Sequence, residues 1–240
     1  MAHARSLLTR PFVARRWPTI RSVAAGLLAT AIALSGCGLA PSPTGTAALT
    51  SSDLFFPTTW NFDRDTTGSI PAGATVFSGS WAVRAEPGAP SAPNAICQTA
   101  SAEFPALRLT SEAHRDMRVT AQVKPISGRE DQAAGVLLRV RDAKNYYVVR
   151  ANALEGNVII FTYVDGRRSE VKSGSATVTA GSWQELRGEI VGTTIRGFVN
   201  GRLVVEATDT SFREGGAGLW TKSDSFTCFD DVTVGPVTGP

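Results

Sequence analysis

The alternation of hydrophobic and polar residues is clearest between residues 136 and 164. Three runs of β-branched, aliphatic and aromatic residues lie there, at residues 136–141, 146–152 and 158–164. The joints between them are residues 142–145 and Glu155-Gly156, and Asp165-Gly166 follows the third run. Runs of this composition, separated by joints of this kind, predict an antiparallel β-meander.

Pairing within the meander assigns each side chain to a face. If Arg141 pairs with Tyr146 and Leu154 pairs with Asn157, side chains alternate between faces with period two. The predicted core face carries Val136, Leu138, Val140, Tyr147, Val149, Ala151, Ile160, Thr162 and Val164. The opposite face carries Leu137, Arg139, Arg141, Tyr146, Val148, Arg150, Asn152, Phe161 and Tyr163, with Arg168 beside Tyr163 and Glu170 beside Phe161.

Short alternating runs also occur on both sides of the meander. They lie at residues 60–63, 80–85, 95–99, 107–110, 117–123, 185–191, 218–222 and 227–234, with a hairpin around Asn200-Gly201. That dipeptide favours the two positive-φ positions of a tight turn. The pattern amounts to about thirteen strands without an amphipathic helix, which is typical of an all-β, antiparallel two-sheet jelly-roll sandwich. We expect the sandwich at residues 54–235 and a short tail at residues 236–240.

The N-terminal residues have the composition of an export signal. Residues 1–36 combine a basic start with a short apolar run, and are predicted to be a signal peptide. Leu34-Ser35-Gly36-Cys37 resembles the bacterial lipobox, so we expect Cys37 to be lipidated and the protein to be anchored outside the cytoplasm. An ordinary signal peptide with an incidental cysteine is the alternative. Residues 37–53 are predicted to be the lipidated cysteine and a disordered tether.

The net charge of +3 comes from the export signal. Residues 1–36 hold five arginines and no acidic residue, and without them 19 basic residues remain against 21 acidic ones. A mature chain with a net charge near −2 gives no electrostatic support to nucleic-acid binding. We therefore expect no nucleic-acid partner.

Two cysteines remain once Cys37 is set aside, namely Cys97 and Cys228. An even pair in an oxidising compartment favours a disulfide. The alternative is two buried free thiols that pack as small hydrophobic side chains.

Several motifs resemble one group of domains. They are Ala-Gly-Val-Leu-Leu-Arg (134–139), Asn-Tyr-Tyr-Val-Val-Arg (145–150), Leu-Glu-Gly-Asn (154–157), Gly-Ser-Trp-Gln-Glu-Leu-Arg (181–187), Val-Asn-Gly (199–201), Ala-Gly-Leu-Trp-Thr-Lys-Ser-Asp-Ser (217–225) and Phe-Asp-Asp (229–231). This order is similar to the bacterial laminin-G-like and 3-keto-disaccharide-hydrolase-like domains of the concanavalin A-like lectin/glucanase superfamily. The resemblance implies a jelly-roll fold and says little about activity.

The residues favour binding over catalysis. Retaining glucanases of this superfamily carry Glu-x-Asp-x-x-Glu on one strand, and the chain contains no such string. His114, which we expect to be a solvated loop residue, has no partners at the spacing of a zinc site. No cofactor is predicted other than a calcium ion, for which Asp63 and Asp231 are the candidate ligands.

The candidate ligand-binding residues are Arg139, Tyr146, Arg150 and Tyr163, because flat rings and planar donors suit the two surfaces of a sugar. The alternative is that these arginines and aromatic residues only stabilise a solvated sheet. The leading hypothesis is a lipid-anchored, non-catalytic domain that binds carbohydrate or another cell-envelope ligand. A glycoside-acting hydrolase and a protein-interaction module are the alternatives.

Overall fold

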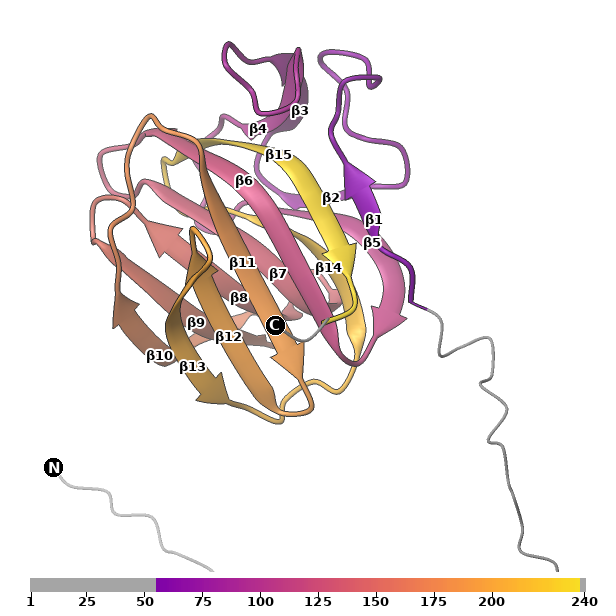
Figure 1. Cartoon of the computed structure of the whole chain (residues 1–240), viewed down its shortest axis with the longest axis vertical. Coiled ribbons are helices and arrows are strands. Elements are labelled where there is room, and N and C mark those ends of the chain that lie inside the picture. The colour runs from indigo at the N-terminus through magenta and orange to yellow at the C-terminus, as the bar shows by residue number, and fades with distance from the viewer. Residues whose placement is uncertain (1–54, 238–240) are drawn as a thin grey trace, which may run out of the picture. The chain divides into compact units, whose positions relative to one another are not determined.

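The computed structural model describes residues 55–237, and within that range it contains fifteen strands and no helix (Figure 1). The predicted signal peptide, Cys37 and the predicted tether up to residue 53 lie outside the described residues. The described part of the chain has no helix long and apolar enough to cross a membrane.

The strands form two antiparallel sheets. The first sheet has the order β13 (Arg202–Thr208), β12 (Thr194–Val199), β11 (Gln184–Val191), β6 (Met117–Ser127), β15 (Phe226–Gly235), β4 (Asn94–Gln98), β3 (Trp81–Ala85), and β1 (Thr58–Trp60) also pairs with β15. The second sheet has the order β10 (Arg167–Ser175), β9 (Asn157–Val164), β8 (Asn145–Asn152), β7 (Ala133–Asp142), β14 (Gly215–Trp220), β5 (Ala106–His114), β2 (Thr75–Ser78). Figure 1 shows β11, β6 and β15 in front of β7 and β8. The predicted two-sheet antiparallel sandwich is confirmed.

The main hydrophobic core lies between the two sheets, because it draws on strands of both. It includes Val119, Ala121, Leu186, Ile190 and Phe229 from the first sheet, and Val136, Leu138, Tyr147, Val149 and Ile160 from the second. A second cluster contains residues of the second sheet, including Leu137, Tyr146, Val148, Phe161, Tyr163 and Trp220, with Phe77 and Phe104 packed against it. This second cluster therefore covers the outer face of the second sheet, the face turned away from the first sheet.

The predicted pairing of the meander is displaced by two residues. At the joint Asp142 pairs with Asn145, in the predicted register, but further along β7 Leu138 pairs with Tyr147 where Val149 was expected. Asn152, not Leu154, pairs with Asn157. A shift of two keeps every side chain on its predicted face, because the side-chain period is also two. The neighbours Arg168–Tyr163 and Glu170–Phe161 are as predicted.

The exception is a β-bulge in β7 between Leu138 and Asp142. Residues 139–141 of β7 lie there opposite Tyr146 alone, and Arg139 has a positive φ of 49°, so the strand gains two residues and the alternation is locally broken. Val140 consequently joins the outer cluster although it was predicted to lie in the core. Arg139 was predicted on the outer face, and it instead reaches the loops at the end of the sandwich.

The predicted disulfide joins Cys97 and Cys228, which lie directly opposite each other in β4 and β15. It closes a loop with a sequence separation of 131 residues. Both half-cystines are fully buried in a small cluster on the first sheet, with Trp183 and Phe226 packed against it. The disulfide therefore ties an early strand to the last one, as expected.

Candidate functional site

Three of the four predicted ligand-binding residues share the outer face of the second sheet. Tyr146 and Tyr163 are directly opposite in β8 and β9, and Arg150 lies four residues further along β8. Arg139 does not belong to this group, because the bulge turns it away. All four side chains are buried, with relative exposures of 1–3%, so they do not form the open surface that the sequence suggested.

These residues belong to a larger set that we name the aromatic–arginine layer, which consists of Tyr146, Arg150, Phe161, Tyr163, Arg168 and Trp220. The Tyr146 and Tyr163 rings stack with centroids 4.6 Å apart. The guanidinium of Arg168 lies 4.6 Å from the centroid of Phe161, and that of Arg150 lies 5.5 Å from it on the same ring. Rings and guanidinium planes are thus interleaved across three neighbouring strands.

Gly135 makes room for the largest ring of the layer. It pairs with Trp220 across β7 and β14, and a Cβ atom at residue 135 would come within 3.2 Å of Trp220 Cβ and Cε3. The same Cβ would lie 3.2 Å from a methyl group of Val148. A residue without a side chain therefore lets the Trp220 ring lie close to the sheet.

Phe104 of the β4–β5 loop (residues 99–105) covers the layer. Its ring is stacked on Trp220 at 6.0 Å and meets Tyr163 edge-on at 5.2 Å. Backbone hydrogen bonds hold the loop in place: Thr221 N–H donates to the Pro105 carbonyl at 2.9 Å, and Ala102 N–H donates to the Ser223 carbonyl at 3.2 Å. The loop passes from the first sheet to the second, so it closes one side of the sandwich over these rings.

Four buried polar atoms of the layer have no hydrogen-bond partner among the described residues: Arg150 Nε, Tyr163 Oη, Arg168 Nη1 and Trp220 Nε1. The Tyr146 hydroxyl lies close to Trp220 and Tyr163, and both affect its pKa. Trp220 Nε1 and Tyr163 Oη nevertheless remain without a well-formed hydrogen bond. Burial raises the pKa of Tyr146 to about 12, so its hydroxyl stays protonated at neutral pH. Buried polar atoms are normally paired, and four of the ten unpaired ones among the described residues belong to this layer.

A polar network holds Arg150 at one end of the layer. Its Nη1 and Nη2 donate to Glu155 at 3.2 and 2.8 Å, and Nη2 also donates to Asn157 at 3.0 Å. Buried Asp131 lies 3.7 Å from Arg150 Nη1 and also accepts from Lys222. Hydrogen bonding to Arg150 lowers the pKa of Glu155 to about 2. Glu155 is therefore ionised at neutral pH and is unsuited to donate a proton as a general acid.

Arg139 instead holds together three loops at the far end of the sandwich. Its Nε donates to the Arg115 carbonyl at 2.7 Å, Nη1 to the Phe212 carbonyl at 2.8 Å, and Nη2 to the Gly192 carbonyl at 2.8 Å. Those loops are β5–β6, β13–β14 and β11–β12. The side chain is 2% exposed, so Arg139 has a structural role in joining the loops.

An open hollow lies beside these loops, which we name the basic hollow. Its volume is about 540 Å³, and it is lined by Ser111, Ala113, Arg115, Val140, Arg141, Thr210, Ser211, Arg213, Glu214 and Gly215. An adjoining hollow of about 530 Å³ shares Arg115, Thr210 and Arg213 with it and adds Asp116, Arg139, Gly192, Thr193 and Phe212.

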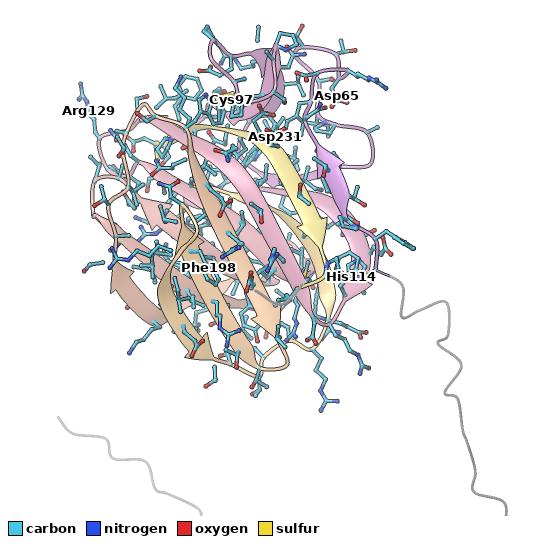
Figure 2. All side chains as sticks on the ribbon, in the orientation of Figure 1. Asp65, Cys97, His114, Arg129, Phe198 and Asp231 are labelled. Atoms are coloured by element: carbon cyan, nitrogen blue, oxygen red, sulfur yellow. A yellow bond between two sulfur atoms is a disulfide. The ribbon has the colours of Figure 1, made fainter. Side chains whose placement is uncertain are left out.

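The proposed calcium ligands are not brought into a recognisable metal centre. Asp63 accepts a hydrogen bond from the Asn94 backbone N–H at 3.2 Å. Asp230, not Asp231, is the buried carboxylate nearby; it accepts from Ser91 N and Oγ at 2.8 and 2.9 Å, and burial raises its pKa. Figure 2 places Asp231 on the upper part of β15. A calcium site at Asp63 and Asp231 stays a prediction.

Among the described residues, one group of three potential metal ligands converges, namely Glu86 with Cys97 and Cys228. The disulfide removes both sulfurs as thiolate ligands, so this group does not fit a metal ion.

The expectation that His114 is a solvated loop residue is wrong. It ends β5, its side chain is 11% exposed, and its ring is stacked on Phe55 with centroids 3.5 Å apart (Figure 2). Desolvation lowers the pKa of its imidazole. His114 therefore packs against the start of the folded part of the chain.

Comparisons with known structures agree on the fold. A carbohydrate-binding module, CBM66 from Bacillus subtilis, is similar with a TM-score of 0.59 and 23% identity over 68% of this chain and 95% of that module. A β-glucanase from Bacillus licheniformis is similar with a TM-score of 0.52 and 11% identity over 77% of this chain and 98% of the enzyme. The fold is therefore the jelly-roll sandwich that these two structures share.

No protein-family model matches the chain, and no curated protein is similar enough in sequence to be matched. Both solved structures are less than 25% identical to the chain and show the fold alone, so the superfamily that the sequence motifs resemble stays a prediction, as does the particular family within it.

Arg168 and Trp220 belong to the layer and Phe104 covers it, but none of the three was among the predicted ligand-binding residues. The sequence predicts Arg168 beside Tyr163, so its membership of the layer was predictable. Trp220 lies in a strand that is far from the meander in sequence and next to it in space. Phe104 is in a loop, where no periodicity indicates the direction of a side chain.

Proposed function

We propose that this chain is a non-catalytic carbohydrate-binding protein whose aromatic–arginine layer holds the sugar, and that a lipid on Cys37 anchors it outside the cytoplasm. The observation that carries the proposal is the group of four buried polar atoms without partners on one ring-covered face. Arg150, Arg168 and Trp220 offer N–H donors, and Tyr163 offers a hydroxyl that donates or accepts. A sugar hydroxyl supplies the acceptors that these donors lack.

The rings supply the second half of the recognition. A sugar ring presents apolar C–H groups on one surface and hydroxyls at its edge, so it stacks on an aromatic ring while its edge is hydrogen-bonded. Trp220, Tyr146 and Tyr163 are adjacent to the unpaired donors, so the layer combines both kinds of contact. The likeness of the fold to a carbohydrate-binding module supports the same class of ligand.

Access to the layer requires Phe104 to leave Trp220 and Tyr163. The contacts of Phe104 are ring contacts at 5.2 and 6.0 Å, and the β4–β5 loop that carries it is a connection at the surface. Loops are the part of a fold that opens most easily. We therefore infer that binding is coupled to displacement of this loop.

The carboxylates near the layer favour binding without catalysis. Asp131 and Glu155 are both engaged by cationic side chains, Arg150 and Lys222. Glycoside hydrolysis requires one carboxyl group that is protonated at the working pH. The low pKa of Glu155 does not meet that requirement.

The test is a glycan array followed by calorimetry with the best ligand on Tyr163→Phe. This variant removes the unpaired hydroxyl and keeps the ring, so affinity should fall by about 1 kcal/mol, roughly fivefold, with little change in stability. The matched control is Tyr147→Phe, whose hydroxyl donates to Asp209 at 2.7 Å within the fold. The control should lose stability and keep its affinity.

Equal affinities of the parent and Tyr163→Phe for every glycan that binds would place the ligand elsewhere. Release of reducing sugar by the parent would favour the glycoside hydrolase that the β-glucanase likeness also suggests.

A further inference from the structure

We propose that the basic hollow is a second ligand site and that it binds the carboxylate of an acidic sugar. It lies at the loop end of the sandwich and uses none of the residues of the aromatic–arginine layer. The two proposals are therefore independent and are tested with different variants.

The charges of the hollow are unbalanced. Its lining and that of the adjoining hollow carry Arg115, Arg139, Arg141 and Arg213, against two carboxylates, Asp116 and Glu214. Glu214 pairs with Arg115 at 3.4 Å, and Asp116 lies 3.6 Å from Arg139.

Arg141 and Arg213 are exposed, and neither forms an ion pair within residues 55–237. Two guanidinium groups are thus left for an anion. Each presents a planar set of N–H donors that suits a carboxylate.

The hollow is fixed in shape before any ligand arrives. Arg139 joins the three loops that line it and the adjoining hollow, through backbone carbonyls. The β13–β14 loop is held a second time, because the Phe212 N–H donates to the Tyr147 hydroxyl at 3.0 Å. Asp209 accepts both from that hydroxyl and from the Ser211 N–H, each at 2.7 Å. A site that is already ordered loses less entropy on binding.

The other residues that line the basic hollow indicate which kind of molecule bears the anionic group. Ser111, Ser211 and Thr210 place hydroxyl-bearing residues beside the arginines, which suits a ligand with several hydroxyl groups. A volume of about 540 Å³ is within the range of small-molecule sites and is far smaller than a membrane surface requires. A uronic acid combines a carboxylate with ring hydroxyls and therefore fits both features.

Calorimetry with galacturonate, galactose and inorganic phosphate tests the proposal on the whole domain. Galacturonate should bind and galactose should not, and Arg141→Gln and Arg213→Gln should each weaken galacturonate binding about tenfold. Arg167→Gln is the matched control, because Arg167 is an equally exposed arginine at the start of β10. Raising the ionic strength from about 0.01 M to about 0.15 M should weaken binding further.

Three results would overturn the proposal. One is galactose binding as tightly as galacturonate, which would remove the role of the charge. Another is phosphate binding more tightly than galacturonate, which would make the hollow a general anion site. The third is loss of galacturonate binding in Tyr163→Phe but not in the two arginine variants, which would put the acidic sugar in the layer.

Discussion

Arg139 and Arg150 are both buried arginines of the meander, and their guanidinium groups have different partners. Arg139 donates to three backbone carbonyls from three loops. Arg150 donates to the side chains of Glu155 and Asn157 and keeps one unpaired nitrogen. Paired donors stabilise a buried cation, and both arginines have both of their Nη atoms paired. The first residue therefore serves the loops, and the second retains a donor for a ligand.

Arg139→Met should reduce the free energy of unfolding by about 3 kcal/mol, because three buried carbonyls lose their donor. Urea unfolding at neutral pH measures this change. Arg141→Met is the control, since Arg141 is an exposed neighbour in the same strand and should change the stability by less than about 0.5 kcal/mol. Equal losses in the two variants would mean that the hydrogen bonds of Arg139 are not what holds the loops.

The lowered pKa of Glu155 predicts that protonation of this carboxylate contributes to acid unfolding. Its pKa in the folded protein, about 2, lies below the ordinary value of 4.5 because Arg150 donates to it. The ionised form therefore stabilises the fold above pH 4.5, and this stability is lost as the pH falls from about 4.5 to about 2. Because the side chain is 41% exposed, solvent screens the interaction, and we expect about 1 kcal/mol.

Urea unfolding between neutral pH and pH 3 tests this for Glu155→Gln. The variant should be less stable than the parent at neutral pH, and the difference should shrink toward pH 3. Glu170→Gln, at an exposed position of β10, is the control, and its free energy of unfolding should differ from that of the parent by the same amount at each pH. A difference between Glu155→Gln and the parent that does not change with pH would contradict the prediction.

At the scale of elements, the β4–β5 loop decides whether the aromatic–arginine layer is reached. Phe104→Ala removes the ring that contacts Trp220 and Tyr163. If opening of the loop limits binding, the association rate constant for the best glycan should rise several-fold, because a larger fraction of molecules is competent to bind. Thermal stability should fall at the same time, since the rings lose a packing partner.

Stopped-flow fluorescence measures the rate, and Phe56→Ala is the control because Phe56 is an exposed aromatic residue outside the layer. If Phe104→Ala and the parent have the same association rate constant, the loop does not limit access to the layer.

The sequence predicts elements well and local irregularities poorly. Outside the bulge at Arg139 and Val140, the predicted faces of the meander hold despite a pairing error of two residues, since hydrophobic alternation reports faces and not exact partners. The bulge at Arg139 has no signature in that alternation, so the side chain was assigned to the wrong face. Neither Phe104 nor the basic hollow was predictable, because both depend on loops that pairing of distant strands brings together.

At the scale of the whole molecule, the described domain is stabilised in two ways that do not depend on any ligand. One is the core between the two sheets, and the other is the disulfide that joins Cys97 of β4 to Cys228 of β15. On the chain-entropy model, a crosslink over a loop of this length stabilises by roughly 4–5 kcal/mol. A location outside the cytoplasm stays a prediction of the sequence, and it would provide the oxidising environment in which such a bond forms.

The third cysteine gives the last prediction. Leu34-Ser35-Gly36-Cys37 follows a short apolar run, and we expect a lipid on Cys37 to hold the protein at a membrane. Two acyl chains on one residue bind a bilayer far more strongly than a single chain does. Cys37→Ala should therefore move the protein from the membrane fraction to the soluble fraction, and mass spectrometry of the parent should find a diacylated N-terminal cysteine.

The matched control replaces Cys97 and Cys228 together with alanine. That variant loses the disulfide and should be less stable, but it should stay in the membrane fraction, because we expect the lipid on Cys37 alone. Fractionation with a high-salt wash separates an acyl anchor from charge-based adhesion, which salt screens. If Cys37→Ala sediments with membranes as firmly as the parent after that wash, the lipoprotein assignment is wrong, and the chain is held by another part of its sequence.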